Sequence, residues 1–344
     1  MLSRLYGTLA TRRRRWYESR SDRRRRLRQP VISVGALAVG GSGKTPTVAH
    51  LAELLVSMGE QPAVLSRGYA RRHRADGVVV VSDRGTLRSD VDLSGDEPLM
   101  LARQLPHVSV VVCDDRYLAG RLAESSLGAT VHLLDDGFQH FSLERAVDLV
   151  LLDSGDLDDT RTLPAGRLRE PIELATKADI LLVDTEDPAR AREVGDRVGL
   201  KTVFRIIRRL QIPYDAATLR ATQPPRGARV LAVAGIGRPS SFTDALGSVG
   251  YDVVETMAFT DHHGYTPSDL KTIAARAQAL AVDVVMTTEK DLERFRSHAP
   301  WTFPLLAVPL RVSVEPADAF QARLGQALTA ARTNHVDVPI GVTK

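Results

Sequence analysis

The chain has 344 residues, of which 43% are hydrophobic and 26% are charged, a balance that is typical of a globular protein with room for two domains. Its single cysteine, Cys113, excludes an intrachain disulfide and any zinc site built from several cysteines, and it favours a reducing compartment. No uncharged apolar run reaches the roughly 18 residues that a membrane-spanning helix needs, so we expect no segment that crosses a bilayer.

The first 29 residues form a strongly basic segment. Within residues 1–30, eleven arginines are opposed only by Glu18 and Asp22, which gives a net charge of +9 and leaves −5 for residues 31–344 out of the total of +4. Large apolar side chains recur before and between the arginine clusters, with helical spacing in the first turns, at Leu2, Leu5, Tyr6, Leu9, Trp16 and Tyr17. This pattern favours a helix that lies in a membrane interface.

The partner of this basic segment is not fixed by its composition. Anionic lipid head groups attract such a segment by about 1 kcal/mol per basic residue, and nucleic-acid phosphates would also bind it by counterion release. The net charge of −5 on residues 31–344 argues against a basic binding face on the folded body. We therefore expect an anionic membrane surface and no nucleic acid, and the remaining interpretation is a solvated basic tail.

From residue 30 onward, short β-branched runs alternate with amphipathic helical patterns. Seven runs read as buried strands, at 31–34, 63–65, 78–81, 108–112, 131–134, 149–152 and 180–183. Near-continuous apolar strands separated by helices are typical of a parallel sheet with helices on both faces. The predicted fold class is therefore α/β, with a core domain over residues 30–210.

A polar passage rich in proline interrupts this alternation, and we assign residues 211–228 to a linker. Four further runs then read as strands, at 230–233, 252–255, 282–287 and 305–308, and an alanine-rich helix follows Pro316. These elements predict a second, smaller α/β domain over residues 229–332, followed by a tail over 333–344. We find no internal repeat.

The first strand leads into a glycine-rich loop and then into a helix with one apolar face. The loop contains Gly40, Gly41, Ser42, Gly43, Lys44 and Thr45, although Ala38 stands where the P-loop pattern has its first glycine. In such loops, backbone N–H groups and the helix N-terminus hold phosphates, the lysine reaches the β- and γ-phosphates, and the hydroxyl ligates Mg²⁺. The loop predicts ATP binding by a P-loop NTPase-like core.

Acidic residues follow three of the predicted strands, at Asp114-Asp115, Asp135-Asp136 and Asp153. Because the carboxyl ends of parallel strands meet at the ligand-binding edge, one or two of these carboxylates should hold Mg²⁺ directly or through water. The run 135–140, Asp-Asp-Gly-Phe-Gln-His, is the most distinctive of them. A further acidic step, Gly95-Asp96-Glu97-Pro98, reads by itself as a helix start with Asp96 as a candidate cap.

The second unit contributes Asp261-His262-His263 in a loop after a strand. A zinc site is disfavoured there, because Cys113 is far away in the sequence and no third histidine has suitable spacing. A histidine oriented by an acid fits phosphoryl transfer better, since a hydroxyl nucleophile must lose its proton. This loop would have to face the P-loop across a cleft between the domains.

Taken together, these motifs resemble those of the tetraacyldisaccharide 4′-kinase family. The resemblance covers nearly the whole chain, and its motifs are, in order, Val34-Gly35, the loop from Gly40 to Pro46, Ser66-Arg67-Gly68-Tyr69, Gly95-Asp96-Glu97-Pro98, Asp114-Asp115-Arg116, the run 135–140, Leu163-Pro164-Ala165-Gly166, Leu168-Arg169-Glu170-Pro171, Gly235-Ile236-Gly237, Asp261-His262-His263 and Thr287-Thr288-Glu289-Lys290-Asp291. The joint order is far more specific than any single motif.

The resemblance implies a kinase of lipid A biosynthesis that uses ATP and Mg²⁺ to phosphorylate the 4′-hydroxyl of a tetraacylated glucosamine disaccharide 1-phosphate. It implies a peripheral location at the cytoplasmic face of the bacterial inner membrane, and we infer no protein partner. By position, Asp96 would be the catalytic base and His262 its partner. The implied metal neighbours are Thr45, Glu97, Asp135 and Asp136. Substrate or nucleotide contacts are implied for Arg67, Tyr69, Gln139, His140 and Arg169.

Two features depart from the family pattern. Ala36 and Ala38 stand where family loops usually carry Asn and Thr, so backbone contacts would have to hold the phosphates. The N-terminal helix is short and rich in arginine, which shifts membrane attachment toward electrostatics. The alternative function is a P-loop NTPase switch or metal-delivery protein, which would hydrolyse nucleotide without phosphorylating a lipid acceptor.

Overall fold

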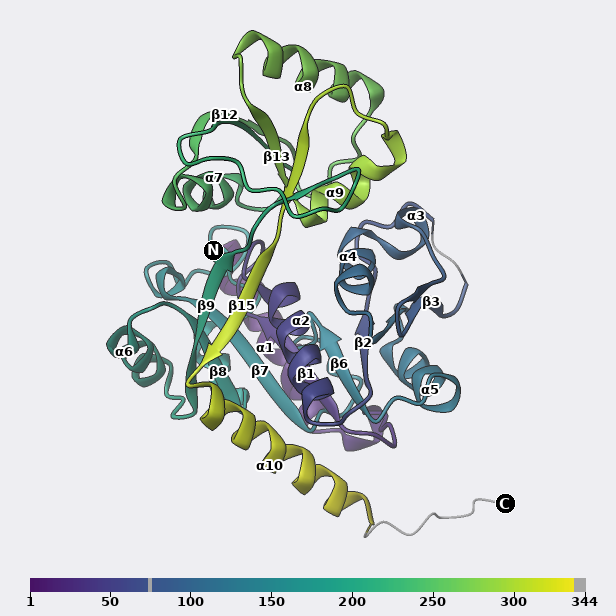
Figure 1. Cartoon of the computed structure of the whole chain (residues 1–344). Coiled ribbons are helices and arrows are strands. Elements are labelled where there is room, and N and C mark those ends of the chain that lie inside the picture. Colours follow the sequence, from purple (N-terminus) through teal and green to yellow (C-terminus); the bar gives the residue numbers. More distant parts are fainter. Residues whose placement is uncertain (74–75, 337–344) are drawn as a thin grey trace.

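The computed structural model describes residues 1–73 and 76–336, and Figure 1 shows two α/β units joined by a pair of long strands. The larger unit contains a ten-stranded sheet in the order β15-β9-β8-β7-β1-β6-β2-β5-β3-β4. Its strands are β1 (Val31–Ala36), β2 (Pro62–Ser66), β3 (Val79–Asp83), β4 (Thr86–Leu87), β5 (Ser109–Val112), β6 (Val131–Asp135), β7 (Val147–Asp153), β8 (Ile180–Asp184), β9 (Val203–Leu210) and β15 (Leu310–Glu315). The seven strands from β9 to β5 in this order pair in parallel. Six of them were predicted, but β9 was not, and the predicted strand at 78–81 (β3) pairs antiparallel with β5 at the edge of the sheet.

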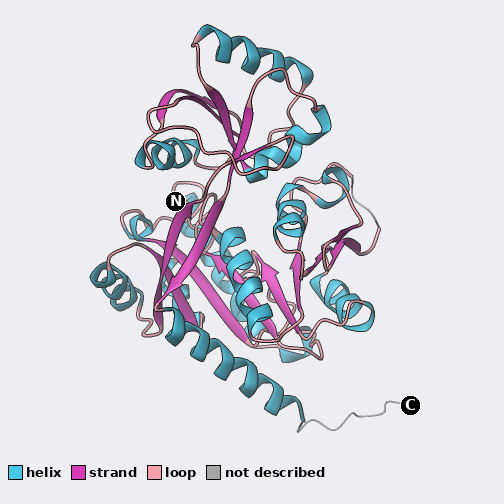
Figure 2. Cartoon of the chain, in the orientation of Figure 1, coloured by secondary structure: helices cyan, strands magenta, loops and turns pink. Residues whose placement is uncertain are grey.

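Helices cover both faces of this sheet, which confirms the predicted fold class. The helices of the unit are α1 (Leu2–Glu18), α2 (Lys44–Ser57), α3 (Val91–Ser94), α4 (Asp96–Gln104), α5 (Arg116–Ser126), α6 (Pro188–Val198) and α10 (Ala317–Val336). Apolar residues of α2, α4 and α10 bury one face of β1 and its neighbours. The other face packs against α5 at one end and α6 at the other. Figure 2 shows these layers by element type.

The smaller unit is a five-stranded sheet in the order β10-β14-β13-β11-β12, with helices on both faces. Its strands are β10 (Tyr214–Asp215), β11 (Arg229–Ala234), β12 (Asp252–Ala258), β13 (Val284–Thr288) and β14 (Leu305–Val308), and its helices are α7 (Pro239–Ser248), α8 (Pro267–Ala279) and α9 (Glu289–Phe295). Helix α9 packs against α4 of the larger unit, so the two units meet beside the start of α4.

The end of the chain differs from the predicted division. Residues 229–332 were expected to form one domain, but β15 returns to the larger sheet and pairs antiparallel with β9, from Leu310 opposite Leu210 to Glu315 opposite Arg205. Helix α10 then buries Phe320 and Leu324 in the core of the larger unit. The β9 strand carries three arginines within eight residues, and this polarity hides a strand from the hydrophobic pattern.

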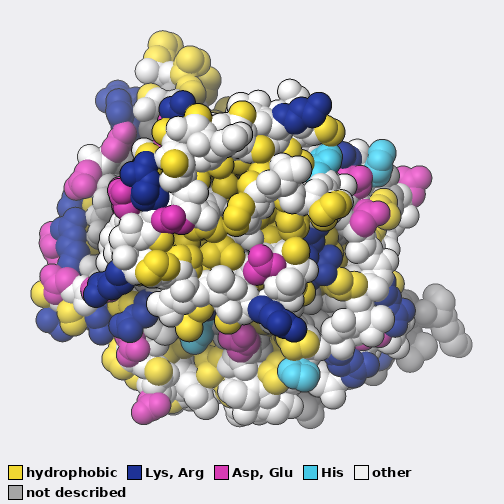
Figure 3. Space-filling model, turned by 45° about the horizontal axis from the view of Figure 1, so that its top comes forward, with side chains coloured by type: hydrophobic (Ala, Val, Ile, Leu, Met, Phe, Trp, Pro, Cys, Tyr) yellow, Lys and Arg dark blue, Asp and Glu magenta, His cyan; other side chains and the backbone are white. Residues whose placement is uncertain are grey.

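The visible surface mixes charges of both signs. In the space-filling view of Figure 3, Lys and Arg side chains are interspersed with Asp and Glu, and hydrophobic side chains gather toward the middle of that face. No helix within residues 1–73 and 76–336 is long and apolar enough to span a bilayer.

Candidate active site

The glycine-rich loop connects β1 to α2 at the carboxyl edge of the larger sheet. Gly40, Gly41 and Gly43 have positive φ angles of 72°, 43° and 80°, a conformation that glycine adopts without the penalty of a side chain. Successive positive φ angles before the N-terminus of α2 are the backbone geometry from which an anion cradle is formed. At the start of α2, Lys44 Nζ lies 2.9 Å from Ser42 Oγ and 3.6 Å from Asp136 Oδ1.

The acidic residues predicted near a metal lie beside this loop, because β6 is the parallel neighbour of β1 and Val34 is in register with Asp135. The hydroxyl of Thr45 lies 3.5 Å from both Glu97 Oε2 and Asp135 Oδ2. Burial, together with the charges of Glu97 and Asp136, raises the pKa of Asp135 to about 7. The charges of Lys44 and Arg116 act to lower this pKa but do not outweigh the effects that raise it.

Asp136 is only half-buried, and it has two basic partners. Burial acts to raise the pKa of Asp136, yet Lys44 and Arg169 outweigh this and hold it below its usual value. Arg169 Nη1 lies 2.6 Å from Asp136 Oδ2. The lysine, the aspartate and Arg169 therefore form one charged group above the P-loop.

The described residues contain no cluster of three or more His, Cys, Asp or Glu side chains arranged around a metal. Mg²⁺ in kinases needs only one or two protein ligands, with phosphate oxygens and water completing the shell. The buried Oδ1 atom of Asp135 has no hydrogen-bond partner within residues 1–73 and 76–336, and Thr45 and Glu97 lie next to the same carboxyl group. This oxygen-rich donor set fits Mg²⁺ bound together with a nucleotide.

Asp96 and His262 meet across the two units, as the sequence predicted. Asp96 is the first residue of α4 and only 1% exposed, and His262 follows β12 in the smaller unit. His262 Nδ1 lies 3.0 Å from each carboxylate oxygen of Asp96. Because a carboxylate oxygen only accepts, the histidine donates its Nδ1–H here, and Nε2 of the neutral ring is then an acceptor, with Lys290 Nζ 3.3 Å away.

The charge state of this dyad is set by basic neighbours. Burial acts to raise the pKa of Asp96, but the hydrogen bond from His262 and the charges of Lys290, His262 and Arg294 lower it to about 2. Arg294 Nε donates to Asp96 Oδ2 over 2.8 Å. Burial acts to lower the pKa of His262, but the hydrogen bond to Asp96 and the Asp96 charge raise it.

Two residues of α9 that were given no role from the sequence complete the site. Lys290 Nζ lies 3.3 Å from His262 Nε2, 3.2 Å from Glu97 Oε1 and 2.7 Å from Asp261 Oδ1. Arg294 is the second residue. Lys290 lies within one of the motifs that carry the family resemblance, so that motif could have identified it as a candidate site residue. Arg294 lies outside those motifs, and only the packing of α9 on α4 reveals it.

The predicted substrate contacts divide into two groups. Tyr69 is 68% exposed and its ring centroid lies 5.1 Å from that of His262, so it lines the opening above the dyad. Arg67 lies 3.6 Å from Asp114 and is also exposed. Arg169 faces Asp136. These three residues are available to a ligand.

Gln139 and His140 have internal partners instead. The Gln139 amide donates to the Ala36 carbonyl over 3.2 Å and to Glu170 over 3.1 Å. The His140 ring lies 3.2 Å from Ser142 Oγ. Burial and the nearby arginines lower the pKa of His140 to about 4, so it is neutral at physiological pH. In this structure both side chains support the site from behind, and their predicted contact with substrate stays a prediction.

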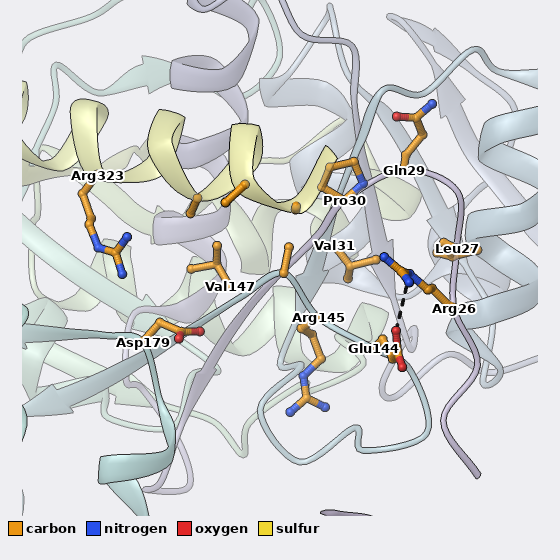
Figure 4. A pocket seen from close by; sticks show the side chains of 14 residues that line it. Arg26, Leu27, Gln29, Pro30, Val31, Glu144, Arg145, Val147, Asp179 and Arg323 are labelled. Atoms are coloured by element: carbon orange, nitrogen blue, oxygen red, sulfur yellow. Dashed lines mark ion pairs between the residues drawn. The ribbon is translucent and has the colours of Figure 1, made fainter. Parts of the chain in front are cut away.

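A separate cavity of about 370 Å³ lies at the opposite edge of the sheet. Figure 4 shows that Arg26, Arg145, Asp179 and Arg323 line it, with an Arg26–Glu144 ion pair of 3.6 Å at one side. Its apolar wall includes Val31 and Val147, the first residues of β1 and β7, whereas the P-loop follows the last residue of β1. The cavity is therefore not part of the site described above.

Comparisons with known proteins agree with this geometry. The sequence model described as tetraacyldisaccharide-1-P 4′-kinase matches residues 1–329. The chain is 37% identical to a tetraacyldisaccharide 4′-kinase of Syntrophus aciditrophicus over 322 residues, which covers 89% of this chain and 86% of that one. It is 40% identical to the enzyme of that name from Bradyrhizobium diazoefficiens over 295 residues, covering 86% and 82% of the two chains.

A solved structure has the same fold. The crystal structure of LpxK from Aquifex aeolicus in complex with ATP superposes with a TM-score of 0.74 at 31% identity, covering 95% of this chain and 97% of the other. These matches favour the kinase over the NTPase switch or metal-delivery protein. The chain belongs to the tetraacyldisaccharide 4′-kinase family.

Proposed function

We propose that this protein transfers the γ-phosphate of ATP to the 4′-hydroxyl of a tetraacylated glucosamine disaccharide 1-phosphate, a step of lipid A biosynthesis. The observation that carries the proposal is that the P-loop region and the Asp96–His262 pair lie together at one edge of the larger sheet. Lys44 and Thr45 lie in the P-loop, Glu97 lies 3.5 Å from Thr45, and the adjacent Asp96 pairs with His262 at 3.0 Å. A phosphate donor and a hydroxyl acceptor can therefore meet between them.

The donor side is formed by the P-loop. Backbone N–H groups of residues 40–45 and the Lys44 ammonium would bind the β- and γ-phosphates, and Arg169 would face the γ-phosphate from the opposite side. Thr45 and Asp135 would hold Mg²⁺, with Glu97 beside them. When bound, the ion neutralises charge on the phosphate oxygens. The positive ion would favour the ionised form of the Asp135 carboxyl group, whose pKa is otherwise about 7.

The acceptor side is formed by the Asp96–His262 dyad. Asp96, with a pKa of about 2, is ionised throughout the physiological range and is a weak proton acceptor by itself. Its hydrogen bond orients the imidazole, whose raised pKa suits it to accept a proton. We propose that the dyad acts as one unit, which takes the proton of the acceptor hydroxyl as the new P–O bond forms.

The membrane side is formed by α1. Its exposed apolar residues include Leu2, Leu5, Tyr6, Leu9 and Trp16, while Gly7 and Arg14 are buried against the body. The helix thus has one face available to acyl chains and head groups and another held by the protein. We propose a peripheral location at the cytoplasmic face of the inner membrane, with the exposed arginines bound to anionic lipids.

The direct test is incubation of the protein with γ-labelled ATP, Mg²⁺ and the disaccharide 1-phosphate dispersed in detergent. We expect label in the lipid, none in a lipid whose 4′-hydroxyl is methylated, and a loss of orders of magnitude in Lys44→Ala. Release of labelled phosphate without labelled lipid would instead support the NTPase alternative.

Membrane attachment has its own test. The protein should sediment with vesicles that contain anionic phospholipid at low ionic strength, and salt should release it, because screening shortens the range of each arginine–lipid attraction. Sedimentation that is unchanged at 1 M salt would contradict an electrostatic attachment.

A further inference from the structure

Helix α1 does more than present a surface to the membrane, because one of its arginines is buried inside the protein. Arg14 is 2% exposed, whereas its neighbours Arg13 and Arg15 are exposed. Its guanidinium donates to both carboxylate oxygens of Glu170, over 2.9 and 2.7 Å. It also lies over the Phe138 ring, 4.2 Å from the centroid. A buried guanidinium held in this way fixes the position of its partners.

The partner, Glu170, adjoins an active-site residue. Glu170 binds Arg14, while the preceding residue, Arg169, turns the other way and binds Asp136 over 2.6 Å. Asp136 in turn pairs with Lys44 of the P-loop. Glu170 also accepts from Gln139, which donates to the carbonyl of Ala36, the last residue of β1. Two short routes therefore lead from the membrane helix to the P-loop.

The segment 162–171 lies between helix α1 and the P-loop. On one side it contacts α1, since Thr162 Oγ1 donates to the Ser3 carbonyl over 2.5 Å and the Ala165 N–H donates to Ser3 Oγ over 3.1 Å. On the other side it forms an isolated bridge with the P-loop, in which the Val39 N–H donates to the Arg167 carbonyl over 2.9 Å. The Arg169 N–H donates to the Leu37 carbonyl over 2.6 Å.

We propose that Arg14 is a positioning residue, through which docking of the membrane helix α1 on Glu170 holds Arg169 against Asp136 and the P-loop. A chain whose helix is undocked would bind ATP more weakly and transfer phosphate more slowly, even when the acceptor is supplied in detergent. The rate effect rests on the proposed function, but the effect on ATP affinity does not.

The test removes the ion pair without leaving a buried charge unpaired, using the double variant Arg14→Met with Glu170→Met. We expect ATP affinity and kcat each to fall by about tenfold or more, since a 1 Å displacement of a phosphate-binding group can cost up to about a hundredfold. The exposed leucines and arginines of α1 remain, so sedimentation with anionic vesicles should persist.

The matched control removes another ion pair that anchors a terminal helix. Arg332 on α10 lies 2.7 Å from Glu60 in the loop that precedes β2, at the edge of the sheet opposite the P-loop. In Arg332→Met with Glu60→Met, ATP affinity and kcat should stay within about twofold of the parent, because sites without shared partners act independently.

The decisive comparison is a cycle with Arg169→Ala. If Arg14 acts through Arg169, the losses in ATP affinity from the pair variant and from Arg169→Ala will not multiply when combined. If the pair variant does not fold, Arg14→Lys, which keeps the charge but loses the two-point geometry, enters the same cycle. Losses that multiply fully, or parental ATP affinity in the pair variant, would overturn the proposal, and ATP binding decides this even if no lipid is phosphorylated.

Discussion

Asp96 and Asp135 lie at the same edge of the same sheet and are 1% and 5% exposed, yet their carboxyl groups titrate in opposite directions. Burial alone would raise the pKa of both. The pKa of Asp96 falls to about 2 because His262, Lys290 and Arg294 surround its carboxylate. The pKa of Asp135 rises to about 7 because its charged neighbours include two further acids, Glu97 and Asp136, which add to the effect of burial.

The difference shows which part of the site the protein completes by itself. Among the described residues, the basic partners of Asp96 are His262, Lys290 and Arg294, which come from the smaller unit, in the loop after β12 and in α9. This region is therefore charge-balanced once the two units meet. The region around Asp135 keeps a buried oxygen with no hydrogen-bond partner among the described residues, and the pKa of Asp135 stays raised although Lys44 and Arg116 act to lower it. We infer that the first region serves proton transfer and that the second is balanced by Mg²⁺ with ATP.

Removal of the Asp96 carboxylate should reduce activity most. Asp96→Ala leaves His262 without its acceptor, so we expect kcat to fall by about 10³-fold, within the 10²–10⁴ range of general acid–base catalysis. ATP affinity should change little, because the P-loop keeps its contacts. Rates of labelled lipid formation and equilibrium ATP binding measure the two quantities, and a near-parental kcat would exclude Asp96 from the proton-accepting unit.

A second Asp–His pair provides the matched control. His263 lies 3.1 Å from Asp269, which also caps helix α8 outside the site. Asp269→Ala should lower the free energy of unfolding by about 1 kcal/mol through the lost cap interactions, while kcat stays parental. If both aspartate variants lost activity equally, disruption of the smaller unit rather than loss of the dyad would explain the result.

The next largest effect concerns Asp135. Asp135→Asn keeps the shape but removes the carboxylate, so we expect the Mg²⁺ concentration for half-maximal activity to rise roughly tenfold to a hundredfold. Without Mg²⁺, the same variant should bind ATP at least as tightly as the parent, because a negative charge beside the phosphates is gone. A Mg²⁺ titration of activity tests the first expectation, and an ATP binding titration in the presence of a chelator tests the second. A Mg²⁺ requirement equal to that of the parent would show that Asp135 is not a ligand.

Much of the Asp135 region could be predicted from the sequence because its determinants are local. The P-loop lies directly between β1 and α2, and Asp135 ends a strand whose other residues are apolar except for His132. Parallel pairing of β1 with β6 then brings Lys44 and Asp135 together without any further information. The hydrophobic periodicity and the spacing of the motifs were therefore enough to predict the fold class and the position of the P-loop.

The Asp96 region depends on contacts between distant parts of the chain. Arg294 meets Asp96 across 198 residues, and only the packing of α4 on α9 brings them together. A lone arginine on a helix has no spacing that marks it as a partner of a buried carboxylate. The family resemblance placed His262 beside Asp96, but neither periodicity nor charge pattern required it. The β9–β15 pairing escaped prediction for the same reason, since its partners lie on either side of the whole smaller unit.

A smaller effect should appear as proton release. With a pKa of about 7, Asp135 is about half protonated at neutral pH, and a bound metal requires the carboxylate. Binding of ATP with Mg²⁺ at pH 7 should therefore release about half a proton from this group, and less at pH 8. Calorimetry in buffers of different ionisation enthalpy measures the number of protons released on binding. If Asp135→Asn released as many protons as the parent, the proton would come from another residue.

The smallest effect is a shift of the pH profile set by the charges around His262. The pKa of His262 is raised from 6.5, so the imidazole stays protonated to higher pH and activity should fall as pH drops through that raised value. Lys290 lowers this pKa and Glu97 raises it. Lys290→Met should therefore move the acidic limb of kcat/KM to higher pH, and Glu97→Gln should move it to lower pH. Limbs that move in the same direction, or not at all, would mean that the titrating group is not His262, because two neighbours of opposite charge must shift one imidazole in opposite directions.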